Sequence, residues 1–142
     1  MTCESRRRGR YASGMVPTPR SGAERWYLVL AWSVLIFTVV VVVSGDVVQA
    51  TSSGAGCGES WPRCDGSIIP GLGDSATIIE FTHRALTALL SIGFAALLAA
   101  SAVVHGRRSA TTRAAAWAVG FLVVEIVIGA LLVAFGWVED DA

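Results

Sequence analysis

Residues 26–44 read WYLVLAWSVLIFTVVVVVS, a run of nineteen residues without a charge. A helix needs about this length of apolar sequence to cross a bilayer. The four valines at 40–43 would weaken a helix in water, but in lipid the backbone must satisfy its own hydrogen bonds, so we expect a helix. A cleavable signal peptide is the alternative, since Val48-Gln49-Ala50 resembles a cleavage site. The run is long for a signal peptide and further apolar runs follow it, which favours a transmembrane helix.

Further apolar runs follow in the chain. Hydrophobic residues make up 54% of the 142 residues, more than the core of so small a soluble domain can hide. Two more spans are predicted, at about 77–104 and 114–138, and together they define a membrane domain over residues 26–138. The sequence therefore predicts an all-α polytopic membrane protein with three transmembrane helices. Residues 1–25 read as a disordered polar tail.

The arginines predict how the chain crosses the membrane. All eleven basic residues are Arg; six precede the first span, three lie in the 105–113 turn and one lies in the 45–76 loop. The positive-inside rule places the N-terminus and the turn in the cytoplasm, and the 45–76 loop and residues 139–142 outside the plasma membrane. Nucleic-acid binding would explain the tail alone, so we expect membrane lipid as a partner and no nucleic acid.

The 45–76 loop contains the stretch SGAGCGESWPRCDG, residues 53–66, with Cys57 and Cys64. On the oxidising side of the membrane a disulfide between them can persist, and closing the eight-residue ring would stabilise the loop by about 2.5 kcal/mol. The pair is either a structural link or a redox-active couple. The spacing is not C-x-x-C, the usual oxidoreductase signature, and two thiols without a histidine do not favour zinc.

Three ionisable residues lie at the start of the second span. Glu80 and His83 are three residues apart and so share one helix face. A neutral imidazole there suits a metal or a haem iron, and a carboxylate one turn away suits orienting it or moving protons. Alternatively, Glu80 completes a capping box with Thr77, and His83 extends to the membrane interface. Arg84 meets lipid headgroups or an anionic ligand such as a propionate.

Glu125 lies near the middle of the third span, where a charge costs at least about 2.5 kcal/mol. We expect its side chain to face other helices or a cavity. It either lines a cofactor site or makes a polar helix contact beside Gly129, which permits close approach.

Two motifs in this order resemble one family. The loop pattern T-x-S-G-x-G-C followed by W-P-x-C-x-G covers residues 51–66, and E-x-x-H-R covers residues 80–84. Both are similar to the haem A synthase family, membrane enzymes that oxidise the methyl group of haem O to the formyl group of haem A. The resemblance runs from about residue 26 to residue 137.

The resemblance implies roles for particular residues. His83 corresponds to the histidine that ligates the haem iron on the outer side of the N-terminal half of the family. Glu80 corresponds to an essential carboxylate close to the substrate haem. Cys57 and Cys64 correspond to a disulfide near that haem, serving stability or electron delivery, and Trp61 would pack on the macrocycle.

The chain also departs from the family pattern. Members usually have eight spans in two four-helix halves, whereas three spans are predicted here, as part of one half. We therefore expect an N-terminal portion that is incomplete alone, with the family's haem b site in the absent C-terminal half. A second polypeptide or another copy would supply the missing helices. The alternatives are a small haem-binding or haem-transfer protein without catalysis, and a membrane thiol-redox or assembly protein that uses the loop cysteines.

Overall fold

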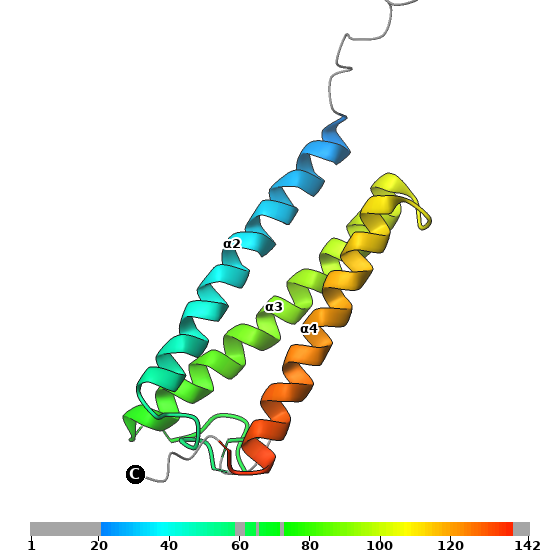
Figure 1. Cartoon of the computed structure of the whole chain (residues 1–142). Helices are drawn as coiled ribbons and strands as arrows, with labels where there is room; N and C mark the ends of the chain where they lie inside the picture. Colours follow the sequence, from blue (N-terminus) through cyan, green and yellow to red (C-terminus); the bar gives the residue numbers. More distant parts are fainter. Residues whose placement is uncertain (1–20, 59–61, 65, 72, 138–142) are drawn as a thin grey trace, which may run out of the picture.

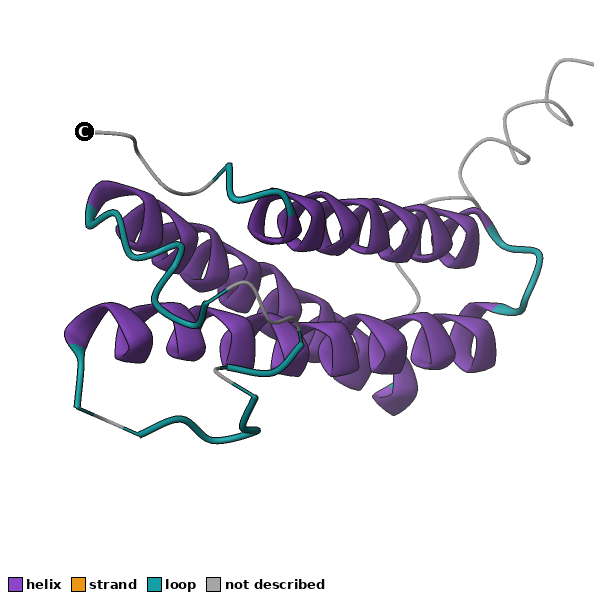
Figure 2. Cartoon of the chain, turned by 90° about the horizontal axis from the view of Figure 1, so that it is seen from below, coloured by secondary structure: helices purple, strands orange, loops and turns teal. Residues whose placement is uncertain are grey.

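The residues that the structure describes form three long α-helices: α2 (Gly22–Ala50), α3 (Ser75–His105) and α4 (Ala110–Ala134) (Figure 1). The structure is a computed structural model that describes residues 21–58, 62–64, 66–71 and 73–137. Each helix is long and apolar enough to cross a membrane. Among the described residues Figure 2 shows only helices and loops, without a strand. The predicted all-α fold with three transmembrane helices is confirmed.

Polar side chains fix where the helices begin. Ser21 accepts a hydrogen bond from the backbone N–H of Glu24, and the Glu24 carboxylate accepts one from the N–H of Ser21. This capping box starts α2 before the apolar run. Asp74 starts α3 by accepting from the N–H of Thr77, and Ser109 starts α4 in the same way.

The capping box predicted from Thr77 and Glu80 is therefore wrong. The N-cap of α3 is Asp74, three residues before Thr77, and its carboxylate accepts from the N–H of Thr77 in the first turn. An aspartate is a strong N-cap residue, so the helix begins one turn earlier than the Thr77 motif indicates. The Glu80 carboxylate is thus left for other partners.

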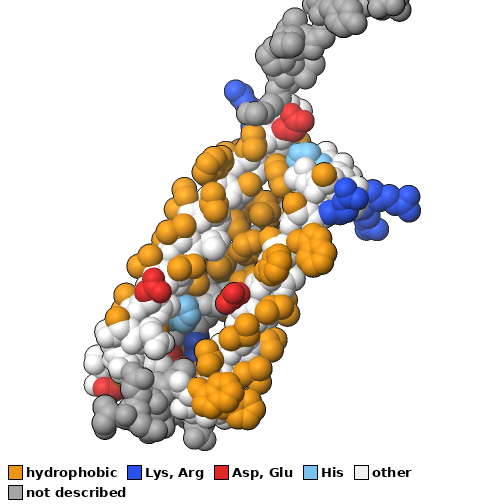
Figure 3. Space-filling view, viewed as in Figure 1, with side chains coloured by type: hydrophobic (Ala, Val, Ile, Leu, Met, Phe, Trp, Pro, Cys, Tyr) orange, Lys and Arg blue, Asp and Glu red, His pale blue; other side chains and the backbone are white. Residues whose placement is uncertain are grey.

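The central helix is α3, which packs against both α2 and α4 (Figure 1). Val34 and Val41 of α2 and Leu90 of α3 form the small buried core, with partly buried apolar side chains around it. Most other apolar side chains of the three helices are exposed, and Figure 3 shows them covering the length of the helices. Such a surface suits lipid rather than water.

The functional residues gather at one end of the helices. We call this the loop end: α2 finishes there at Ala50, α3 starts at Ser75 and α4 finishes at Ala134 (Figure 1). The connection between α2 and α3 folds over this end and carries both loop cysteines. At the opposite end a short turn through Gly106, with φ at 87°, joins α3 to α4. Residues 1–20, Trp61 and residues 138–142 lie outside the described part, so the fold does not address the predictions for them. Residues 22–25, expected in the disordered tail, belong to α2 because the Ser21 cap starts the helix before the apolar run.

Candidate functional site

A buried disulfide forms the centre of the loop. Cys57 and Cys64 are bonded to each other, and their residues are 0% and 2% exposed. Backbone hydrogen bonds between Cys64 and Ser67, at 2.9 and 3.0 Å, close the turn that follows. The sulfurs are therefore shielded from reagents in solution, as expected of a structural link.

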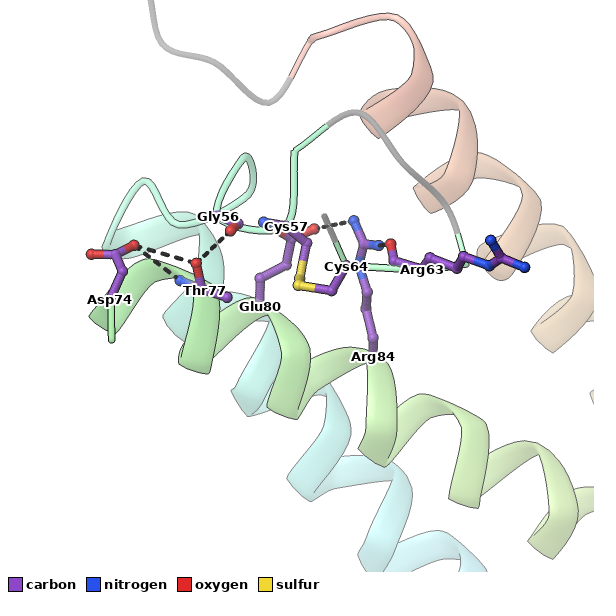
Figure 4. Close-up of a disulfide and its surroundings, with 8 residues drawn as sticks. All are labelled: Gly56, Cys57, Arg63, Cys64, Asp74, Thr77, Glu80 and Arg84. Atoms are coloured by element: carbon purple, nitrogen blue, oxygen red, sulfur yellow. Dashed lines mark hydrogen bonds and ion pairs between the residues drawn. A yellow bond between two sulfur atoms is a disulfide. The ribbon is translucent and has the colours of Figure 1, made fainter. Parts of the chain in front are cut away.

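Glu80 anchors the first cysteine from below. Its Oε2 accepts a hydrogen bond of 2.6 Å from the backbone N–H of Cys57, and its Oε1 pairs with the guanidinium of Arg84. The residue is only 3% exposed, so these two partners replace the water that would otherwise surround its carboxylate. Figure 4 shows the carboxylate between the α3 helix and the loop that it holds.

Arg84 anchors the second cysteine. Besides its pair with Glu80, its Nη1 donates a 2.9 Å hydrogen bond to the carbonyl oxygen of Arg63, the residue before Cys64. Glu80 and Arg84 therefore hold the two arms of the disulfide ring from consecutive turns of α3 (Figure 4). This geometry places Arg84 on the loop rather than among lipid headgroups. That Arg84 also binds a propionate stays a prediction.

Gly56 lets the loop lie directly on the start of α3. The Thr77 hydroxyl donates a 2.6 Å hydrogen bond to the Gly56 carbonyl oxygen. A Cβ at position 56 would come closer than 3.0 Å to backbone atoms of Ala76 and Thr77. Only glycine allows this approach, so the loop glycine has a packing role that its sequence motif did not explain.

His83 lies one turn along α3 from Glu80 and faces α2. Its Nδ1 is 2.8 Å from the hydroxyl oxygen of Ser44, and its ring packs over Gly45. The ring is half-buried rather than extended toward the interface. Within the described part of the chain, Nε2 has no hydrogen-bond partner, which leaves that nitrogen as the one suited to a ligand.

Glu125 is separate from this cluster. It is exposed on α4, and no hydrogen bond or ion pair joins it to another described residue. The three described helices leave its side chain exposed, and the expectation that it faces other helices or a cavity stays a prediction. At about 1.5 Å per residue, Glu125 lies about 14 Å from the end of α4 and His83 about 12 Å from the start of α3. Both are thus at a similar depth below the loop end.

The structure therefore brings together four of the predicted residues (Cys57, Cys64, Glu80 and Arg84), with His83 on the adjoining turn. Sequence reasoning missed Ser44 and Gly45, which contact His83 from another helix. Their only signal is that they terminate the first apolar run.

The donor set fits a haem iron better than a bare metal ion. Among residues 21–58, 62–64, 66–71 and 73–137, no three His, Cys, Asp or Glu side chains gather as a metal site would require. A haem iron already has four ligands from its macrocycle and needs only an axial nitrogen from the protein. His83 offers such a nitrogen, Nε2, where α3 packs against α2.

Comparison with known proteins gives consistent matches. The family COX15-CtaA, described as cytochrome oxidase assembly protein, matches residues 28–142. A protein named Protoheme IX farnesyltransferase from Thermus thermophilus is 41% identical over 111 residues, which cover 78% of this chain and 18% of that protein. Proteins named Heme A synthase from Lysinibacillus sphaericus and Staphylococcus aureus are 32% and 36% identical, over 79% and 82% of this chain.

These matches cover only part of each relative. The chain spans 36% and 37% of the length of the two Heme A synthases, and about a fifth of the Thermus protein. No solved structure matches the chain.

Proposed function

Because the chain belongs to the COX15-CtaA family of cytochrome oxidase assembly proteins, we propose that it acts in haem A biosynthesis. In detail, it forms the haem-holding N-terminal part of a haem A synthase, which oxidises the methyl group of haem O to the formyl group of haem A. The observation that carries this proposal is the arrangement at the loop end. A half-buried histidine with one engaged ring nitrogen lies one turn below a disulfide loop that Glu80 and Arg84 hold in place.

In this proposal His83 would hold the haem iron through Nε2. When bound, the haem supplies the methyl group that is oxidised. The disulfide loop would cover the haem edge and restrict water. Glu80 is the carboxylate one turn before His83 on α3, held by the Cys57 N–H and by Arg84. Arg84, on the same helix, would be the cation that pairs with a haem propionate in this proposal.

The loop end faces the outside of the plasma membrane in this proposal, as the arginine distribution indicates. Further helices, from a second polypeptide or another copy, cover the exposed face that carries Glu125 and supply a second axial ligand. The haem b site of the family would lie within these additional helices. Glu125 then lines the haem cavity at the depth of His83.

Thiol exchange by the loop cysteines is the weaker alternative. Exchange needs a sulfur that an attacking thiolate can reach, and both sulfurs belong to residues that are at most 2% exposed. The same burial suits a permanent link that gives the loop its shape.

The proposal is tested by identifying the haem that the chain retains. The full chain is expressed in cells that make haem O, purified in detergent, and its haem is extracted and separated by chromatography. Haem O or haem A in the extract supports the proposal. Haem b alone would instead indicate a general haem carrier, and a chain without any haem would overturn the assignment.

A further inference from the structure

We propose that Ser44 and Gly45 of α2 are positioning residues for His83: Ser44 keeps the proton on Nδ1, and Gly45 sets the plane of the ring, so that Nε2 presents its lone pair. This inference rests on the proposed function only for the nature of the ligand, a haem iron. The state of the imidazole follows from the contacts of the protein itself.

The position of the proton follows from counting hydrogens. The Ser44 hydroxyl oxygen is 2.7 Å from the Val41 carbonyl oxygen and 2.8 Å from His83 Nδ1. A carbonyl oxygen only accepts, and a serine hydroxyl has one hydrogen to donate. Ser44 therefore donates to Val41 and must accept from His83. The hydrogen between Ser44 and His83 thus belongs to Nδ1.

The opposite assignment leaves a contact without a hydrogen. If Ser44 donated to an unprotonated Nδ1, no hydrogen would lie between the Ser44 and Val41 oxygens, and two oxygen lone pairs would face each other at 2.7 Å. Because that contact would be repulsive, the first assignment is favoured. In a neutral imidazole with hydrogen on Nδ1, Nε2 is the unprotonated nitrogen and the one able to ligate iron.

Gly45 lies against the Cε1 edge of the ring, next to the Ser44 contact. A Cβ built on Gly45 would lie 3.2 Å from Cε1, 3.7 Å from Nε2 and 3.8 Å from Nδ1 of His83. The first distance is tighter than an ordinary carbon contact, so an alanine here would push the ring away from α2. The Ser44–His83 hydrogen bond would lengthen as a result, and Nε2 would point elsewhere.

A fixed tautomer matters because a free imidazole divides its population between two forms. Partners that hold the second nitrogen of a ligating histidine orient the ring and raise its basicity, and their loss typically lowers metal affinity about 10- to 100-fold. We expect Ser44→Ala and Gly45→Ala each to weaken binding of iron protoporphyrin IX by about this factor.

The direct test is the nitrogen NMR spectrum of the haem-free chain labelled with ¹⁵N-histidine. The chain has two histidines, so in the His105→Gln variant all remaining histidine signals come from His83. The expected result is a protonated Nδ1 and an unprotonated Nε2 in this background. Adding Ser44→Ala should raise the population with hydrogen on Nε2, and Ser44→Thr, which keeps the hydroxyl, should restore the original pattern.

Ser33→Ala is the matched control. Ser33 donates to the carbonyl oxygen of Val29, one turn earlier in the same helix, but contacts no histidine. The control variant should change neither the His83 signals nor the affinity for iron protoporphyrin IX measured by titration. Circular dichroism checks that each variant keeps its helices.

The outcomes separate this inference from the proposed function. A His83 ring with hydrogen on Nε2 in the Ser44-containing chain would overturn the inference, whatever haem does. A ring with hydrogen on Nδ1 in a chain that binds no haem would keep the inference and refute the proposed function. Haem binding through His83 that is unchanged by Ser44→Ala and Gly45→Ala would overturn the positioning role.

Discussion

Replacing Gly56 by alanine should open the disulfide loop. The added Cβ would lie closer than 3.0 Å to backbone atoms of Ala76 and Thr77, in the first turn of α3. Backbone within a helix cannot move aside as a flexible side chain can, so we expect the loop to lift instead. Two hydrogen bonds would then be lost, from the Cys57 N–H to Glu80 and from the Thr77 hydroxyl to Gly56.

The size of the effect follows from these two bonds. A hydrogen bond to a charged group contributes about 1.5–3 kcal/mol and a neutral one about 1 kcal/mol, so docking of the loop should weaken by about 2.5–4 kcal/mol. Since each 1.4 kcal/mol is a factor of ten, the open population should rise about 60-fold to several hundred-fold. A disulfide that is reduced only from the open loop would react faster by the same factor.

The assay is the rate at which a water-soluble phosphine reduces the Cys57–Cys64 bond in the detergent-purified chain. The free thiols are then labelled with a maleimide large enough to shift the protein on a gel, and the size of the shift gives the number of free thiols. The chain has three cysteines, so reduction changes the count from one to three.

Gly71→Ala is the matched control, because Gly71 lies in the same connection and a Cβ there would meet nothing within 4 Å. We expect its reduction rate to equal that of the unchanged chain. If Gly56→Ala were also reduced at that rate, the tight docking of the loop on α3 would be refuted.

Two further substitutions probe the loop contacts, and a third probes the helix core. Thr77→Val removes one hydroxyl bond to the loop and should speed reduction about fivefold, whereas Thr82→Val, at an exposed site on the same helix, should not. Glu80→Gln keeps an acceptor for the Cys57 N–H but loses the charge paired with Arg84, so reduction should accelerate about tenfold; an unchanged rate would count against that ion pair. Leu90→Ala removes a buried side chain and should lower unfolding stability in detergent by about 2 kcal/mol, while Ile92→Ala at a 66% exposed site should leave the thermal midpoint nearly unchanged.

Length and apolarity were enough to predict the three helices, because a span must satisfy its backbone internally and so leaves little choice of structure. The spacing of Glu80 and His83 likewise placed them on one face of α3. The N-terminal boundary of that helix was less predictable. Both Asp74 and Thr77 are good capping residues, and sequence spacing alone does not show which one the chain uses.

The partners of the site residues could not be predicted from local pattern. The bond between Ser44 and His83 joins residues 39 positions apart, and it depends on how α2 and α3 pack. The hydrogen bond from Cys57 to Glu80 depends on a close approach that Gly56 permits. The surroundings of Glu125 could not be predicted either, because they are set by which helices lie beside α4, and neither α2 nor the described loop covers its side chain.

The central claim, haem bound through His83, is tested most directly by the Soret absorbance per protein after titration with iron protoporphyrin IX. The comparison is between the unchanged chain, His83→Ala and His105→Ala, which removes the other histidine, at the opposite end of α3. We predict a band that is retained in His105→Ala and lost in His83→Ala. A band of equal strength in all three proteins, or in none of them, would contradict the account.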